Sequence, residues 1–240
     1  MRGDQRIAGA WFVGQGGPLV STDPGSGNVV ARLHEASAEQ VGAAIEAARD
    51  ALPEWSATSL ETRTRFLERF QDALREAHSE ISELLSRETG KPRWEAKTEV
   101  DAMVAKVSVS IEMHTQRRRA TPIELPGAAA QTRYRSIGVL AVLGPFNLPG
   151  HLPNGHIVPA LLAGNCIVFK PSELTPGIGR RLVELLESSG LPPGVVNLVQ
   201  GGRAVARRSS AIPVWTAFSS REVMPADEPS HTVSPTAPRR

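Results

Sequence analysis

The sequence predicts an α/β protein in which a helical segment precedes an incomplete, Rossmann-like parallel sheet. Three nearly continuous apolar runs support this prediction, at residues 138–143, 166–169 and 195–199. A run of this kind is typical of a strand that is buried on both faces. Helical periodicity at 150–162 and 176–189 separates the runs, so the order is strand, helix, strand, helix, strand. In such a sheet, ligands bind at the carboxyl ends of the strands.

The chain in front of this sheet begins with a predicted β-hairpin. Short apolar runs at 11–13 and 29–31 lie on either side of 23–28, which is rich in turn-forming residues. A further, exposed strand is predicted at 131–136, where polar and apolar residues alternate.

Several helices are expected after the hairpin. Ser37, with a glutamine three residues later, has the spacing of a capping box, and the first helix is expected to end at Pro53. Thr58 and Glu61 have the same spacing and are expected to begin the second helix. Further periodic stretches lie on either side of 90–92, a Gly-Lys-Pro helix stop.

The composition changes along the chain and divides it into three segments. Residues 1–130 are expected to form the hairpin and helical region, and 131–202 the first part of a nucleotide-binding α/β domain. Residues 203–240 combine scattered arginines with serine and proline and have no periodicity. This composition predicts a disordered tail. The alternative, an arm that binds nucleic acid, has less support because the arginines are not clustered.

Charge and composition limit the partners. Lysine and arginine number 27 against 25 aspartates and glutamates, and the net charge of +2 is too small to indicate nucleic acid. No apolar segment approaches the ~20 residues that span a bilayer, and the N-terminus has no signal-like apolar stretch. We therefore expect a cytoplasmic protein without a nucleic-acid or membrane partner.

Three motifs follow the predicted strands and helices of the α/β segment. They are Gly-Pro-Phe-Asn-Leu-Pro at 144–149, Pro-Ala-Leu-Leu-Ala-Gly-Asn at 159–165 and Phe-Lys-Pro-Ser-Glu-Leu-Thr-Pro at 169–176. In these motifs the chain resembles the aldehyde dehydrogenase superfamily. Further motifs, at 88–96, 150–156 and 191–202, are most similar to the succinylglutamate semialdehyde dehydrogenases of arginine catabolism.

Asn147 is the first candidate site residue. Pro145 and Pro149 stiffen the turn around it at the end of a buried strand, where a side-chain amide could donate to a developing oxyanion. By spacing alone, an asparagine that satisfies its own turn is the alternative. The family resemblance implies the oxyanion role.

A second candidate site follows the next strand, where Lys170 and Glu173 stand three residues apart. Such a pair could hold ribose hydroxyls, although most such pairs are surface ion pairs. The resemblance implies that both residues contact the adenine ribose of NAD(P), with Ser172 nearby and with Pro145 and Phe146 lining the cofactor channel. A carboxylate at Glu173 would favour NAD, because it would repel the 2′-phosphate of NADP.

Other parts of a complete dehydrogenase are not recognisable in the sequence. No Gly-x-Gly-x-x-Gly follows a predicted strand, and 212–220, where the family binds the pyrophosphate, contains no glycine. The single cysteine, Cys166, lies in an apolar run and is expected to be a core residue and not the nucleophile. His151 and His156 lack the spacing and the companions of a zinc site, so no metal is expected.

The resemblance implies NAD-dependent oxidation of N-succinyl-L-glutamate 5-semialdehyde to N-succinylglutamate by a homo-oligomeric enzyme. We expect this chain to be a truncated, inactive fragment whose sequence after residue 202 arises from a shifted reading frame. The alternatives are a non-catalytic remnant that binds nucleotide or associates with other subunits, and another semialdehyde specificity.

Overall fold

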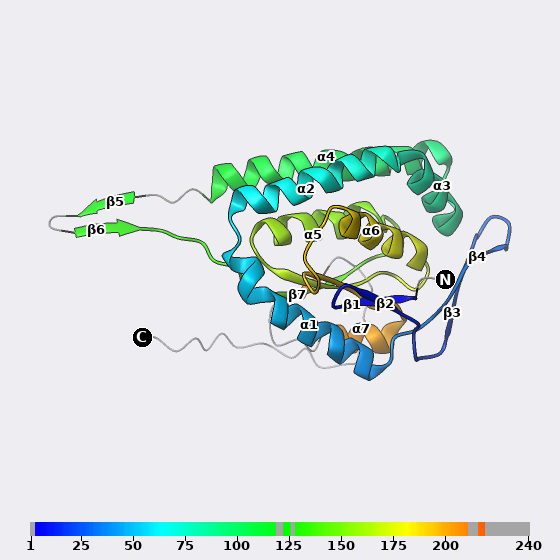
Figure 1. Ribbon diagram of the computed structural model, residues 1–240. Coiled ribbons are helices and arrows are strands. Elements are labelled where there is room, and N and C mark those ends of the chain that lie inside the picture. The colour runs from blue at the N-terminus through cyan, green and yellow to red at the C-terminus, as the bar shows by residue number, and fades with distance from the viewer. Residues whose placement is uncertain (1–2, 119–121, 126–127, 211–215, 219–240) are drawn as a thin grey trace, which may run out of the picture.

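A six-stranded sheet forms the centre of the protein (Figure 1). The computed structural model describes residues 3–118, 122–125, 128–210 and 216–218. The strands in spatial order are β10 (Thr216–Phe218), β7 (Val139–Leu143), β8 (Cys166–Lys170), β9 (Val196–Leu198), β1 (Gln5–Ile7) and β2 (Ala10–Phe12). The first four strands are parallel, and β1 and β2 extend the sheet antiparallel.

Helices cover both faces of this sheet (Figure 1). On one face lie α5 (His151–Leu162) and α6 (Pro176–Ser188), and on the other lie α1 (Ala38–Ala57) and α7 (Arg203–Ser210). A further layer packs over α5 and α6 and consists of α2 (Leu60–Glu76), α3 (His78–Thr89) and α4 (Arg93–Arg117). None of the helices that the structure describes is both long and apolar enough to cross a membrane.

Two hairpins lie outside the central sheet. One consists of β3 (Pro18–Thr22) and β4 (Val29–His34), and the other of β5 (Pro122–Leu125) and β6 (Ala128–Gln131). The second hairpin projects away from the body of the protein (Figure 1).

The predicted fold class is confirmed. The three apolar runs form β7, β8 and β9, and the two periodic stretches between them form α5 and α6. The residues of β8 and β9 are buried throughout, because helices cover both faces of these strands.

The first predicted hairpin is only partly correct. The turn lies where it was expected, but β4 pairs with Pro18–Thr22 and not with residues 11–13. Trp11 instead pairs with Arg6 of β1, and its indole Nε1 donates to Glu187 of α6 at 3.0 Å. This tertiary contact selects the pairing, because the apolar pattern of 11–13 fits either partner equally well.

Two helix boundaries differ from the prediction. The second helix begins after Ser59, whose hydroxyl accepts from the N–H of Thr62 at 3.1 Å, whereas Thr58 ends α1. The first helix continues through Pro53, because the turn beyond it buries Trp55 completely. That burial outweighs the backbone hydrogen bond that a proline removes.

Two predictions about the ends of the α/β segment also differ from the structure. Residues 132–136 form no strand, since β6 ends at Gln131. Residues 203–210 form α7, where disorder was predicted, because Val205 and Ser209 share one buried face of the helix. The prediction for 211–215 and 219–240 lies outside the described residues. Residues 5–12 add β1 and β2 to the main sheet.

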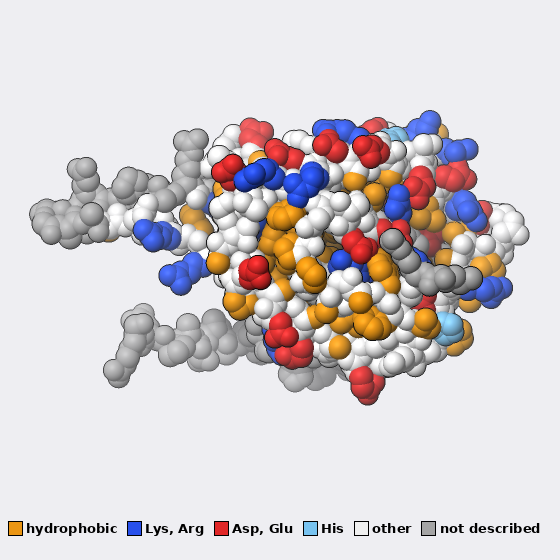
Figure 2. Space-filling view, in the orientation of Figure 1, with side chains coloured by type: hydrophobic (Ala, Val, Ile, Leu, Met, Phe, Trp, Pro, Cys, Tyr) orange, Lys and Arg blue, Asp and Glu red, His pale blue; other side chains and the backbone are white. Residues whose placement is uncertain are grey.

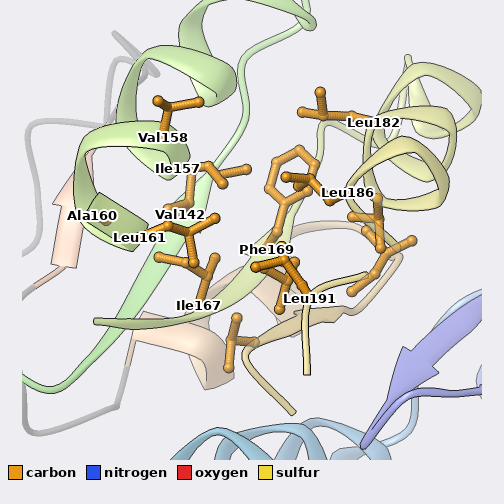
Figure 3. Packing of buried hydrophobic residues seen from close by; sticks show 14 of the residues in the cluster. Val142, Ile157, Val158, Ala160, Leu161, Ile167, Phe169, Leu182, Leu186 and Leu191 are labelled. Carbon is orange, nitrogen blue, oxygen red and sulfur yellow. The ribbon is translucent and has the colours of Figure 1, made fainter. Parts of the chain in front are cut away.

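Phe169 of β8 is the central side chain of the core above the sheet. Its ring lies between Ile157 and Leu161 of α5 and Leu182 and Leu186 of α6, and all five are buried (Figure 3). Phe169 therefore fixes how the two helices sit on the sheet.

We expect Phe169→Ala to lower the free energy of unfolding by about 3–5 kcal/mol, because it leaves a cavity between α5 and α6. The same change at Phe146, which is 55% exposed, should cost less than about 1 kcal/mol. Urea unfolding followed by circular dichroism measures both. Equal losses for the two variants would contradict this account of the core.

Candidate functional site

The two predicted site loops leave the sheet side by side. Leu143, the last residue of β7, is in register with Lys170, the last residue of β8. The N–H of Gly144 donates to the carbonyl of Lys170 at 2.8 Å and joins the two loops where they begin. Because the strands are parallel, both loops lie at the carboxyl edge of the sheet, where this type of fold binds ligands.

The turn after β7 presents Asn147 to solvent. Pro145 is buried, whereas Phe146 and Asn147 are exposed. The backbone carbonyl of Asn147 accepts from Lys91 Nζ at 2.9 Å. Its side-chain amide has no hydrogen-bond partner among the described residues, so it can donate to a ligand at the edge of the sheet.

A buried ion pair holds this turn. Lys91 Nζ lies 2.6 Å from Glu99 Oε2, and the two side chains are 7% and 1% exposed. The other carboxylate oxygen of Glu99 accepts from the backbone N–H groups of Gly150 and His151 at 2.9 and 3.1 Å, at the start of α5. Lys91 therefore connects the Asn147 carbonyl to the helix that follows the turn.

Gly150 makes this arrangement possible. A Cβ at this position would lie 2.6 Å from Met103 Sδ and 3.3 Å from Glu99 Oε1, so any larger residue would require the Met103 side chain to move. Sequence reasoning did not identify Glu99. The available signal was a glutamate on the apolar face of a helix, next to Val100 and one turn after Ala96, where a charge requires a partner.

The loop after β8 holds the Lys170–Glu173 pair. The ammonium group lies 3.1 Å from the carboxylate, and the two side chains are 7% and 37% exposed. Partial burial raises the pKa of Glu173, but its own backbone N–H and Lys170 outweigh this effect and hold the pKa below its usual value. Glu173 is therefore an ionised acceptor facing solvent, with a buried cation behind it.

Ser172 and Phe146 do not join this pair. The Ser172 hydroxyl is buried and accepts from the N–H of Leu174 at 3.2 Å, so it shapes its own loop. Phe146 and Leu174 line a separate cavity of about 310 Å³, together with Glu88 and residues of the β3–β4 hairpin.

Glu88 is a second buried carboxylate next to the candidate site that sequence reasoning missed. It is buried near the end of α3, and its two oxygens accept from the N–H groups of Gly177 and Ile178, each at 2.9 Å. Burial raises the pKa of Glu88 although these donors oppose the shift. Carboxylates therefore occupy the starts of both α5 and α6, so neither helix start is open to a phosphate group.

The described residues fit the ribose of a nucleotide better than its pyrophosphate. Glu173 offers an ionised acceptor for a hydroxyl, whereas the helix starts next to both loops are already capped. The pyrophosphate segment expected at 212–220 lies mostly outside the described residues. Within them, 216–218 form β10 beside β7.

Cys166 and the histidines take no part in this arrangement. Cys166 is fully buried in β8, and burial raises its pKa to about 12. It therefore has neither the access nor the thiolate character of a nucleophile. In the part of the chain that the structure describes, no three His, Cys, Asp or Glu side chains are grouped as a metal site would require.

An open α/β sheet whose neighbouring strands end in such loops is typical of dinucleotide-dependent oxidoreductases. The comparison with known families is more specific. The model of the aldehyde dehydrogenase family matches residues 11–213, and the chain belongs to that family.

Relatives and solved structures agree with this assignment. The chain is 52% identical over 206 residues to N-succinylglutamate 5-semialdehyde dehydrogenase of Escherichia coli, which covers 86% of the chain and 42% of that protein. One similar structure is the NADP-dependent glyceraldehyde-3-phosphate dehydrogenase of Bacillus halodurans complexed with NADP, with 27% identity and a TM-score of 0.82. Another is a NAD-dependent benzaldehyde dehydrogenase of Corynebacterium glutamicum, with 31% identity and a TM-score of 0.77. These matches cover 89% and 85% of the chain and 46% and 45% of those structures. The chain thus spans less than half the length of the curated relatives it matches.

We expect Lys91→Met to lower the free energy of unfolding by about 3–5 kcal/mol, because it leaves the Glu99 carboxylate buried without its cation. Lys97→Met, in an exposed position of α4, the helix that carries Glu99, should change it by no more than about 0.5 kcal/mol. Hydrogen exchange should also speed up at Gly150 and His151 in the first variant only. Unchanged exchange there would show that the ion pair does not hold the turn.

We expect Cys166 to resist a thiol reagent in the folded protein at pH 8 and to react once urea unfolds the chain. Its folded pKa of about 12 lies above the reference value of 9.0. The stability from burying the neutral thiol is therefore fully present below pH 9 and is lost as the pH rises toward 12. Rapid labelling of the native protein would contradict the burial of this group.

Proposed function

We propose that the chain is part of a NAD-dependent aldehyde dehydrogenase that oxidises N-succinylglutamate 5-semialdehyde. One observation carries the proposal: the Asn147 turn and the Lys170–Glu173 loop leave neighbouring parallel strands at one edge of the sheet. An amide donor and a ribose acceptor are thereby carried by neighbouring loops at the same edge of the sheet. The identity to the Escherichia coli enzyme supports the choice of substrate.

In this proposal Asn147 is the catalytic residue that the chain contributes. Its free side-chain amide donates to the oxygen of the substrate carbonyl as negative charge develops there. Lys91 is a positioning residue, because it holds the Asn147 carbonyl and leaves the side chain pointing outward. When bound, NAD accepts the hydride that leaves the substrate carbon.

Lys170 and Glu173 would bind the adenine ribose. The ionised Glu173 accepts hydrogen bonds from the ribose hydroxyls, and Lys170 keeps the carboxylate in place. A 2′-phosphate would approach Glu173 with like charge, and for this reason we infer NAD and not NADP. Segment 131–202 is then the first part of the nucleotide-binding domain, and Phe146 and Ser172 act through the shape of the two loops.

We expect the chain to bind NAD at least about tenfold more tightly than NADP, because the repulsion costs ~1.4 kcal/mol or more. Glu173→Gln should reduce this ratio, whereas Glu68→Gln, on an exposed face of α2, should leave it unchanged. Isothermal titration with both nucleotides measures the ratio. A ratio that Glu173→Gln does not alter would remove Glu173 from the cofactor site.

We further propose that the chain by itself does not turn over. Cys166 is its only thiol, and the attacking group of the reaction cannot be a buried thiol with a pKa of about 12. We expect no NADH from N-succinylglutamate 5-semialdehyde above a blank without protein, while the Escherichia coli relative serves as a positive control. NADH formation by the purified chain would refute this part of the proposal.

One observation favours a second function, association with other subunits. The β5–β6 hairpin projects away from the body, so its backbone edges are available for pairing (Figure 1). We expect co-purification with a full-length aldehyde dehydrogenase if this function holds. Deletion of 122–131 should abolish co-purification without affecting NAD binding.

A further inference from the structure

A second cavity, of about 360 Å³, lies apart from the two site loops. Its walls come from the first turn of α2, the last turns of α4, the segment after β6 and the end of α5. The lining includes three arginines, Arg63, Arg118 and Arg133, together with His114, and no aspartate or glutamate lines the cavity. Over the outer helices, in contrast, acidic and basic side chains are interspersed (Figure 2). The cavity is thus a local concentration of positive charge.

Arg63 is held rigidly at the wall of this cavity. Its Nε donates to the carbonyl of Leu162 at 2.9 Å, and its Nη1 donates to the carbonyls of Thr58 and, at 3.5 Å, of Ser56. Its Nη2 has no partner among the described residues. The side chain therefore loses little further conformational entropy when that nitrogen binds a ligand.

Arg133 and Arg118 complete the cluster. The Nε of Arg133 donates to Gln131 Oε1 at 3.1 Å, and its two terminal nitrogens have no partner in the described part of the chain. The guanidinium of Arg118 stacks on the ring of Tyr134, 5.4 Å from its centroid. Within the described residues, none of the three arginines forms an ion pair with a carboxylate.

The pKa of His114 reflects the positive charge around the cavity. Burial lowers its pKa, and Arg118 and Arg63 lower it further because they repel the protonated ring. Arg63 and Arg118 are therefore close enough to act on the His114 ring. A bound anion would relieve this repulsion and accept several charge-assisted hydrogen bonds.

We propose that this cavity is a binding site for the oxyanion group, phosphate or carboxylate, of a small molecule. Arg63, Arg118 and Arg133 line it from three separate elements, so a group with several acceptor oxygens can accept from more than one of them. The site does not involve Asn147 or the Lys170–Glu173 pair and is independent of the proposed dehydrogenase function.

The test uses the full chain, inorganic phosphate and proton NMR of the histidine rings at constant ionic strength. Phosphate at millimolar concentration should shift the His114 signal saturably and raise its pKa. His78, which contacts Asp101 on the outer helices, should not respond. Substitution His114→Gln assigns the signal. A second titration with succinate shows whether a carboxylate can supply the same group.

Two pairs of variants test the arginines. Arg118→Gln and Arg133→Gln should each weaken binding at least about tenfold, since each removes charge-assisted hydrogen bonds. Arg117→Gln and Arg135→Gln are the matched controls, because these exposed neighbours do not line the cavity. All four positions are exposed, so the variants should fold. The proposal is overturned if neither anion produces a saturable shift, if His78 responds equally, or if the controls weaken binding as much.

Discussion

The arrangement of the site depends on two buried carboxylates that cap helices far from them in sequence. Glu99 of α4 receives the first N–H groups of α5, and Glu88 of α3 receives those of α6. A carboxylate at a helix start is favourable because the unpaired N–H groups carry partial positive charge. The two capped helices follow the two site loops, so the outer helical layer positions both loops.

The two caps differ in how the buried charge is balanced. Glu99 has a cation, Lys91, which also holds the carbonyl of Asn147. Glu88 accepts from two backbone N–H groups, and burial raises its pKa. The carboxylate that is paired with a cation, Glu99, is therefore the one beside the Asn147 turn.

The caps also explain a feature of the sequence. A dinucleotide fold with a glycine-rich fingerprint leaves a helix start open for pyrophosphate. Here the fingerprint is absent, and protein carboxylates fill the helix starts after β7 and β8. The groups that this edge leaves free for a ligand are side chains, those of Asn147 and Glu173, whereas the helix-start N–H groups are already bonded.

How far the sequence predicted the structure depended on the range of the interactions. The turn at 23–28 and the stop at Gly90, which has a φ of 73°, are local and were predicted correctly. The strand partner of Trp11 and the continuation of α1 through Pro53 were not predicted correctly, because contacts with residues far away in the sequence decide both. Helix α7 was missed because a single buried face of two residues, Val205 and Ser209, produces no sustained periodicity.

The sequence by itself determined the three central strands, the two helices between them and the motif turns at their ends. Burial on both faces imposes a composition that a single chain displays directly. Only the tertiary structure decided that Glu88 and Glu99 cap helices 89 and 51 residues away, and that Arg63 reaches a carbonyl 99 residues away. Such contacts join single polar groups across the fold, and a single polar group has no periodicity by which a sequence could reveal its partner.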